Sequence, residues 1–411
     1  MAPMLSCMSF FPGRAVARIT VFVTVRRTES DQSPMSPHRY AYIDALRGYA
    51  ILMVIGVHSS QFFSKLSPSV TAITDQGARG VQLFFVASAM TLFMSWKSRN
   101  DGAKAFYIRR FFRIAPMFYL SIPIFLWLNG VGPSIYAPDG IGLRHITMAA
   151  TFTHGFMPDT ITSVVPGSWS IADEMIFYAV FPLLMAIRVR FATAALLVVA
   201  VTIVCILIQR ETRVFAAHIE DPAWRTAWLT FFFLWIVNQL PCFLFGLLVA
   251  QWLDEGRDVR WPAALVIGAA VCAVLFALYP VRISVFMELS PPMQYGLFFA
   301  TFALGLSHWQ PKALVNPVIC WIGKVSYSAY LVHLALIAGF PVPHDNYPEA
   351  YLALTAITIA ISSLTFKFIE EPFNRIGHAI VARRRSAAIR AAHAAALNDP
   401  KTVRETASLS S

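Results

Sequence analysis

Apolar segments of membrane-spanning length follow one another through most of this 411-residue chain. A run of about 20 apolar residues forms a helix that is long enough to cross the hydrocarbon core of a bilayer. Hydrophobic residues make up 57% of the chain and charged residues only 13%, which is too little charge to cover the surface of a water-soluble protein. We therefore predict an all-α, polytopic membrane protein.

The segments predict about ten transmembrane helices. They are residues 43–63, 79–96, 111–129, 168–187, 191–208, 227–252, 261–280, 293–308, 318–340 and 349–370. A shorter stretch, 143–156, fits a re-entrant or interfacial helix. An even number of spans places both ends of the chain on one side, and most Lys and Arg residues fall in the segments on that side. Because Lys and Arg gather in cytoplasmic loops, both termini are predicted to be cytoplasmic.

Three parts of the chain differ in composition. Residues 1–40 form an N-terminal extension, which we expect to be disordered or to reflect a mis-annotated start, with translation beginning at Met35. Residues 41–372 form the membrane domain. Residues 373–411 form a basic cytoplasmic tail.

The net charge of +11 raises the question of nucleic acid binding. No basic run lies on a soluble module, so the excess is better explained by cytoplasmic loops beside membrane lipids, and nucleic acid is not an expected partner. The five cysteines are scattered singly through the chain. No CxxC or other metal-ligand spacing occurs, so no metal site is predicted.

Arg47 and His58 lie eleven residues apart in the first span. This spacing is about three helical turns, so both side chains share one face and lie about 16 Å apart along the axis. Asp44 is three residues before Arg47 and can pair with it. Arg47 is then expected near the inner end of this face, and His58 near the outer end.

Arg110 and Arg113 share a helical face at the cytoplasmic start of the third span. Guanidinium groups bind phosphate through two parallel hydrogen bonds, so this pair suits a phosphate-bearing ligand. The alternative is a simple positively charged anchor at the membrane edge.

The fourth span begins with Trp169 and places Asp173 and Glu174 near the outer leaflet. His333, in the ninth span, is also expected in the outer half. Ionisable groups inside a membrane are costly and are candidates for function, although a lone histidine such as His333 can also be a hydrogen-bonded packing residue.

Two layers of ionisable groups follow from these placements. The inner layer is cationic and contains Arg47, Arg109, Arg110, Arg113 and Lys324, whereas the outer layer contains His58, Glu174 and His333. An anionic donor could bind inside and reach a histidine that acts as base or nucleophile. The pattern favours group transfer across the membrane, and a transporter or flippase without chemistry remains the alternative from a different class.

Seven fragments, in order over about residues 40–375, resemble the integral-membrane acyltransferase-3 family of bacterial O-acetylases. They are IDALRGYAILMVIGVH, GVQLFFVASAM, RRFFR, GSWSIADEMIFYAVFPLL, NQLPCFLFGLLVA, VSYSAYLVH and FKFIEEPFNR. The third carries the family's Arg-x-x-Arg, and the last two hold Tyr330, His333, Glu370 and Pro372. Ala89, Asp173 and Met175 depart from the family's usual residues and put the local packing and the acceptor site in doubt.

The resemblance implies that residues 41–372 are an acyltransferase domain of the bacterial inner membrane. Its donor would be acyl-coenzyme A, used as a substrate rather than as a tightly bound cofactor, and its acceptor a hydroxyl of a cell-envelope or exported glycan. A small molecule or glycolipid is the alternative acceptor.

The resemblance and the two layers together assign roles to individual residues. The expected catalytic residues are His58, Arg47 and Glu174; the donor-binding residues are Arg110, Arg113 and Arg47; and the substrate-binding residues are Trp169, Ser170, Asp173 and His333. His58 would act as general base or carry the acyl group itself, with Glu174 orienting it or binding the acceptor. Direct transfer and an acyl-histidine intermediate both fit the sequence.

Overall fold

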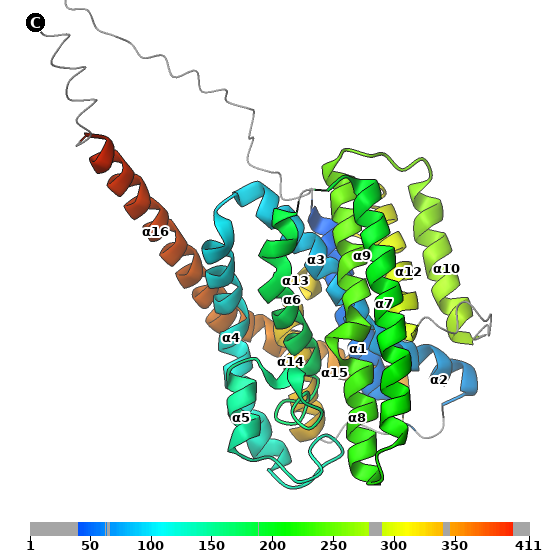
Figure 1. Cartoon of the computed structure of the whole chain (residues 1–411). Helices are drawn as coiled ribbons and strands as arrows, with labels where there is room; N and C mark the ends of the chain where they lie inside the picture. The colour runs from blue at the N-terminus through cyan, green and yellow to red at the C-terminus, as the bar shows by residue number, and fades with distance from the viewer. Residues whose placement is uncertain are drawn as a thin grey trace, which may run out of the picture. The chain divides into compact units, whose positions relative to one another are not determined.

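The fold is that of a computed structural model, which describes residues 40–61, 63, 66–187, 189–278, 290–339 and 346–397. Within these residues every regular element is helical, and the one extended pairing is an isolated bridge between Ser134 and Ala137. Figure 1 shows the helices side by side in a bundle, from which α16 projects. The all-α prediction is confirmed for this part of the chain. Residues 1–39 of the predicted extension, with Met35, and residues 398–411 of the predicted tail lie outside it.

The helices have the following bounds. They are α1 (Ala41–Ser60), α2 (Pro68–Asp75), α3 (Gly80–Arg99), α4 (Gly102–Asn129), α5 (Leu143–Ala150), α6 (Trp169–Ala186), α7 (Phe191–Ala217), α8 (Pro222–Leu234), α9 (Ile236–Asp254), α10 (Pro262–Leu278), α12 (Pro291–His308), α13 (Pro317–Lys324), α14 (Ser326–Gly339), α15 (Tyr347–Thr365) and α16 (Glu371–Leu397). Short 3₁₀ turns cover Gln76–Arg79 and His154–Phe156, and a π-helical turn covers Phe366–Glu370.

Seven helical segments of the described residues are long and apolar enough to cross a membrane, and an eighth follows if the bent pair α13–α14 is one span. Each of these eight overlaps a predicted span, but the count of ten is not confirmed. α10 has only 17 residues, and α12 begins with two prolines and ends in His308, which lowers its apolar character. The predicted orientation of the termini stays a prediction.

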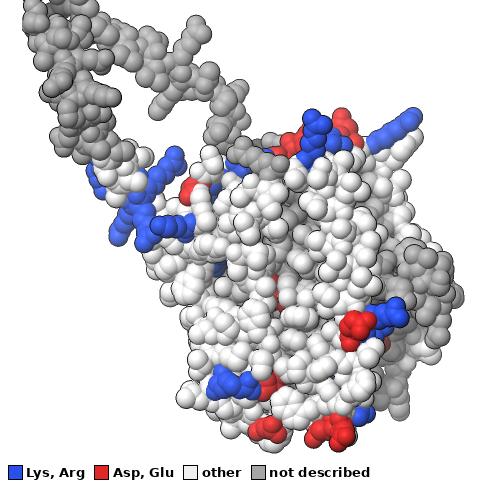
Figure 2. All heavy atoms as spheres, viewed as in Figure 1, with Lys and Arg blue, Asp and Glu red and all other residues white. Residues whose placement is uncertain are grey.

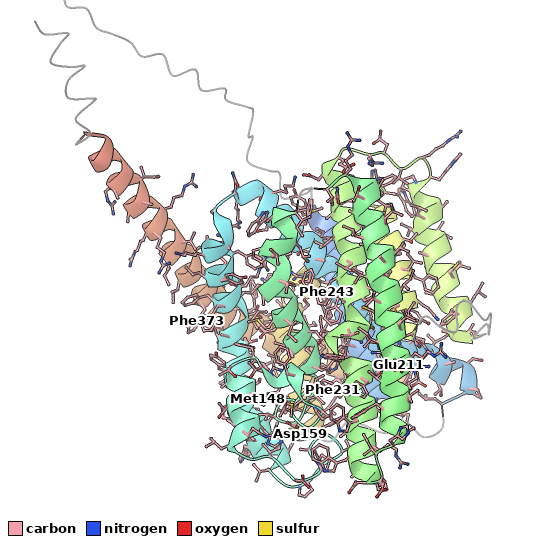
Figure 3. The ribbon with its side chains drawn as sticks, in the orientation of Figure 1. Met148, Asp159, Glu211, Phe231, Phe243 and Phe373 are labelled. Carbon is pink, nitrogen blue, oxygen red and sulfur yellow. The ribbon has the colours of Figure 1, made fainter. Side chains whose placement is uncertain are left out.

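Charged side chains gather toward the two ends of the bundle and on α16 in the view of Figure 2, and the middle of that face is mostly uncharged. This distribution is what a bilayer requires, because charges in the hydrocarbon layer lose their hydration. Figure 3 shows the interior filled by side chains such as Phe243 of α9, with Phe373 near the start of α16.

α1 lies inside the bundle and packs against α3, α13, α14 and α15. Its crossing with α13 brings the two backbones into contact. A Cβ atom on Gly48 would meet the carbonyl oxygen of Ile319, and a Cβ atom on Gly323 would meet the carbonyl oxygen of Asp44. Helices approach this closely only where small residues face each other. Gly48 directly follows Arg47 in the sequence. The close contact therefore fixes the position of the Arg47 backbone within the bundle.

The helix that follows this crossing is broken at Val325. The axes of α13 and α14 differ by 72°, so α14 starts within the bundle. The buried Glu370 of the π-helical turn supports this start, because its Oε1 accepts hydrogen bonds from the backbone N–H of Ser328, at 3.1 Å, and from the Ser328 hydroxyl. A carboxylate at a helix N-terminus satisfies free N–H groups and is favoured by the helix dipole.

The connection between α4 and α6 folds back into the protein. The predicted short helix at 143–156 is present as α5 and a 3₁₀ turn. Residues 159–165 have no regular structure yet are buried, and Asp159, labelled in Figure 3, binds Arg144 and lies 3.2 Å from His145 Nε2. Backbone without regular structure can lie inside a membrane protein only where other parts of the protein shield it from lipid. The segment thus closes one end of the bundle near α6 and α14.

Replacing Gly323 by Ala is expected to push α1 and α13 apart, because the added methyl group would overlap the Asp44 carbonyl oxygen. Overpacking of this kind costs about 1–3 kcal/mol. We expect a lower Tm for the detergent-purified variant than for the wild-type protein.

Gly268→Ala in α10 is the matched control, since a Cβ atom there would meet no atom within 4 Å. Its Tm should equal or slightly exceed the wild-type value, because Ala favours helix more than Gly does. Equal Tm values for the two variants would contradict the tight crossing.

Candidate functional site

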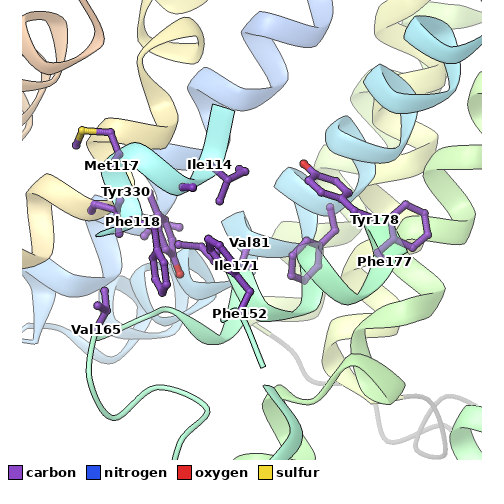
Figure 4. Packing of buried hydrophobic residues seen from close by; sticks show 14 of the residues in the cluster. Val81, Ile114, Met117, Phe118, Phe152, Val165, Ile171, Phe177, Tyr178 and Tyr330 are labelled. Atoms are coloured by element: carbon purple, nitrogen blue, oxygen red, sulfur yellow. The ribbon is translucent and has the colours of Figure 1, made fainter. Parts of the chain in front are cut away.

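A pocket with an empty volume of about 560 Å³ lies among α1, α3, α4, α6 and α14. Its polar lining residues are Arg47, Ser88, Arg113, Ser170, Glu174, Ser326, Tyr327 and Tyr330. Apolar side chains complete the walls, and Figure 4 shows three of them, Val81, Ile114 and Ile171, with Tyr330, packed in the buried cluster around the pocket. Residues from the first, third and fourth predicted spans therefore meet in one place.

Arg47 and Arg113 bring two guanidinium groups to this pocket. Neither forms a hydrogen bond or an ion pair with another residue that the structure describes, and the Nε atom of Arg47 is buried without an acceptor. The expected ion pair between Asp44 and Arg47 is likewise absent from the described contacts. The pocket is therefore lined by positive charge whose hydrogen-bond donors are free for a ligand.

Glu174 is the carboxylate of the pocket, and its hydrogen bonds come from neutral donors. Its Oε1 accepts from the Ser88 hydroxyl at 2.5 Å and from the Tyr178 hydroxyl one turn further along α6. The Tyr178 ring in turn lies under the guanidinium of Arg110, 5.5 Å from its centroid. Arg110 thus lies behind the pocket wall, whereas Arg113 lines the pocket.

His58 lies beyond the pocket lining, in a second group with His333. The two ring centroids are 5.3 Å apart, and the ring of Tyr330 lies 5.8 Å from that of His333. Tyr330 also lines the pocket, where its hydroxyl donates to the Gly167 carbonyl at 2.9 Å and lies 3.0 Å from Ser170 Oγ. Tyr330 therefore connects the arginine pocket to the histidine pair.

The grouping of Glu174 differs from the expected two layers. The sequence placed it in the outer layer beside His58, but it lines the pocket with Arg47 and Arg113. No contact between Glu174 and His58 is present among the described residues. The first turns of α6 lie at the same level as Arg47 of α1. Residue spacing within a single helix does not show how two different helices are placed relative to each other.

The other predicted acceptor-side residues lie around α6. Trp169 packs edge-on against Phe85, with ring centroids 6.0 Å apart. Asp173 is fully buried, is not part of the pocket lining, and has no hydrogen-bond partner for either carboxylate oxygen within the described residues. Ser170 faces the pocket, so of these three residues it is the one placed to meet a ligand there.

Several polar residues at the site had no role assigned from the sequence. Ser88 and Tyr178 hold Glu174, and Glu370 holds the start of α14. The i, i+4 spacing of Glu174 and Tyr178 was a usable signal. The contact with Ser88 joins two different helices, and a single sequence offers no signal for it.

No group of three His, Cys, Asp or Glu side chains in the described ranges is arranged to hold a metal ion. The candidate site is thus a cationic pocket beside a histidine pair.

Residues 40–367 match a family model described as an acyltransferase domain. A Staphylococcus aureus protein named "Putative O-acetyltransferase SACOL0978" is 24% identical over 380 residues, which cover 82% of this chain and 57% of that protein. Peptidoglycan O-acetyltransferase OatA of Listeria monocytogenes is 24% identical, over 82% of this chain and 56% of that protein. Acyltransferase MdmB of Streptomyces mycarofaciens is 25% identical, over 82% of this chain and 92% of that protein. No solved structure gives a significant match.

The chain therefore spans little more than half the length of the two O-acetyltransferase relatives and almost the whole of MdmB. The family model, by contrast, covers most of the described chain. An enzyme is thereby favoured over a transporter without chemistry. The resemblance found in the sequence is confirmed, and the chain belongs to this family of acyltransferases.

Proposed function

We propose that the chain is a multi-pass O-acyltransferase of the bacterial plasma membrane. It moves an acetyl group from acetyl-coenzyme A to a hydroxyl of a cell-envelope or exported glycan. The observation that carries this proposal is the pocket in which Arg47 and Arg113 form no ion pair with any described residue. The acetyltransferase names of the relatives and the apolar helices support it.

The donor side of the proposal follows from the charges of the pocket. Both arginines are partly buried and lack an ion pair, so the pocket favours an anionic ligand. Glu174 carries one negative charge against the two positive charges of Arg47 and Arg113 and forms no ion pair with either, so the charged lining of the pocket stays net positive. The phosphates of coenzyme A suit guanidinium groups, which bind them through paired hydrogen bonds. Arg110 adds positive charge behind the wall.

The chemical step is assigned to His58. It either takes the proton of the acceptor hydroxyl or carries the acyl group between donor and acceptor. Arg47 steers the donor or polarises the thioester carbonyl, and Glu174 keeps the pocket in shape with Ser88 and Tyr178. Trp169, Ser170, Asp173 and His333 remain the proposed acceptor-side residues.

A glycan acceptor is supported by the relative named as a peptidoglycan O-acetyltransferase. A small molecule or glycolipid is the second candidate, because MdmB, the relative matched over 92% of its length, is named only as an acyltransferase. Mass spectrometry of glycans and glycolipids from cells with and without the protein separates the two. An acetyl-sized mass difference in a glycan supports the first candidate, and one confined to small molecules supports the second.

His58→Ala should abolish acyl transfer while the protein stays in the membrane, because it removes the imidazole that takes the proton or carries the acyl group. The measurement is the O-acetyl content of envelope glycans, together with thiol release from acetyl-coenzyme A. His308→Ala is the control, since His308 is exposed at the end of α12. Full activity of His58→Ala would rule out its catalytic role.

Arg113→Gln should raise the KM for acetyl-coenzyme A by about tenfold or more, since a hydrogen bond to a charged group contributes about 1.5–3 kcal/mol. The KM of Arg113→Lys should lie between those of the wild type and Arg113→Gln, because lysine keeps the positive charge but lacks the planar guanidinium group. Arg257→Gln serves as control, as this exposed arginine already pairs with Glu255 at 2.8 Å. An unchanged KM in Arg113→Gln would place the donor elsewhere.

A further inference from the structure

One ring nitrogen of His333 has its hydrogen assigned by the structure. Nδ1 lies 2.9 Å from the carbonyl oxygen of Ala329. A carbonyl oxygen can only accept, so Nδ1 carries the hydrogen and donates it. In the neutral ring, Nε2 is then left with a lone pair and no hydrogen.

This Nε2 atom is buried and has no hydrogen-bond partner among the described residues. A buried acceptor without a donor costs about 1–3 kcal/mol. Such an atom does not by itself identify a function, because His154 shows the same pattern: its Nε2 faces the Ser168 carbonyl at 3.1 Å and its Nδ1 is unpartnered. The surroundings of the two rings must separate a functional histidine from a structural one.

The surroundings of the two histidines differ in one respect. The His154 ring stacks on Phe118, with centroids 5.5 Å apart, so an apolar ring covers it. The His333 ring faces His58 from α1, with centroids 5.3 Å apart and planes tilted by 41°. His58 is the partly exposed member of this pair, and His333 lies fully buried behind it. The unused lone pair of His333 is therefore next to the histidine to which the chemistry is assigned.

We infer that His333 is a positioning residue, which accepts a hydrogen bond from one ring nitrogen of His58 during the reaction and so keeps the other nitrogen of His58 free of hydrogen. The inference rests on the proposed function of His58. A chain of three groups results, from His58 through His333 to the Ala329 carbonyl, and each group orients the one before it. The two ring centroids are 5.3 Å apart, a separation at which an N–H···N hydrogen bond between two imidazole rings can form once the nitrogens face each other.

The proton and bond changes are then defined. The free nitrogen of His58 takes the proton of the acceptor hydroxyl as the hydroxyl oxygen bonds to the acyl carbon. The carbon–sulfur bond breaks, and the proton passes from His58 to the leaving thiolate. His333 neither gains nor loses a proton. In the acyl-histidine route the same free nitrogen bonds to the acyl carbon as the carbon–sulfur bond breaks, which gives an acyl-imidazolium and a thiolate. The acceptor hydroxyl oxygen then bonds to the acyl carbon, the carbon–nitrogen bond breaks, and the hydroxyl proton ends on the thiolate, so the positioning role is the same for both routes.

Gln61, the residue after α1, is the competing partner for His58, since its side chain also interacts with the ring. Gln61 is exposed, so water competes for its hydrogen bonds, whereas Nε2 of His333 is shielded from water. Tyr330 is the other titratable group that faces His333, from its own helix. The inference therefore predicts that His333, and not Gln61, determines the reactivity of His58.

The test measures thiol release from acetyl-coenzyme A in permeabilised cells that produce the full-length protein and hold its native acceptor. His333→Leu removes the acceptor atom and should lower kcat by about 10²-fold or more, with the KM for acetyl-coenzyme A unchanged. His333→Gln offers a carbonyl oxygen to His58 and should recover much of the lost kcat. Gln61→Ala should stay near wild type.

His154→Leu is the matched control, because it also removes a buried histidine with only one hydrogen-bonded ring nitrogen. This variant should have a lower Tm and keep most of the wild-type kcat. Equal losses in His333→Gln and His333→Leu, a raised KM, or a loss in Gln61→Ala instead would overturn the role of His333 alone. If wild type releases no more thiol than His58→Ala, the proposed function fails, and the inference fails with it.

Discussion

The contact on which the site depends is the crossing of α1 and α13, where two glycines let the backbones touch. α1 carries both Arg47 and His58, so its position sets the two ends of the proposed reaction path. α13 ends in the break that starts α14, and α14 brings Tyr327, Tyr330 and His333 to the same path. A single close approach thus aligns α1 with the bent pair α13–α14, and the Cys320 thiol of α13 donates a hydrogen bond to the Ala41 carbonyl of α1 at 3.3 Å beside it.

The hydrogen bonds of Glu174 decide which donors the pocket can offer to a ligand. A carboxylate paired directly with Arg47 or Arg113 would occupy the donors of that guanidinium group. The structure instead gives Glu174 two neutral hydroxyl donors, from Ser88 and Tyr178. Hydroxyl donors satisfy the carboxylate oxygen without using a positive charge. The arginines therefore keep their hydrogen-bonding capacity for a ligand, which agrees with the donor that we propose.

Local patterns in the sequence predicted what lies along single helices. The helical class, seven of the candidate spans and the shared face of Arg47 and His58 follow from periodicity and residue spacing. Contacts between helices did not follow: Glu174 joined the arginines because α6 packs beside α3 at that level. The break at Val325 also gave no signal, since no proline stands there. The count of ten is not confirmed, because α10 is too short and α12 too polar to meet the length and hydropathy expected of a span.

The π-helical turn at Phe366–Glu370 has a consequence for the register of the C-terminal helix. A π turn holds more residues per turn than an α-helix, so it shifts the faces of everything that follows. Removing one residue from the turn would restore α-helical geometry and rotate α16 by about 100°. Glu370 would then leave Ser328, and the arginines of α16 would face a new direction. The orientation of a basic surface helix is thereby linked, through one irregular turn, to the support of the buried site.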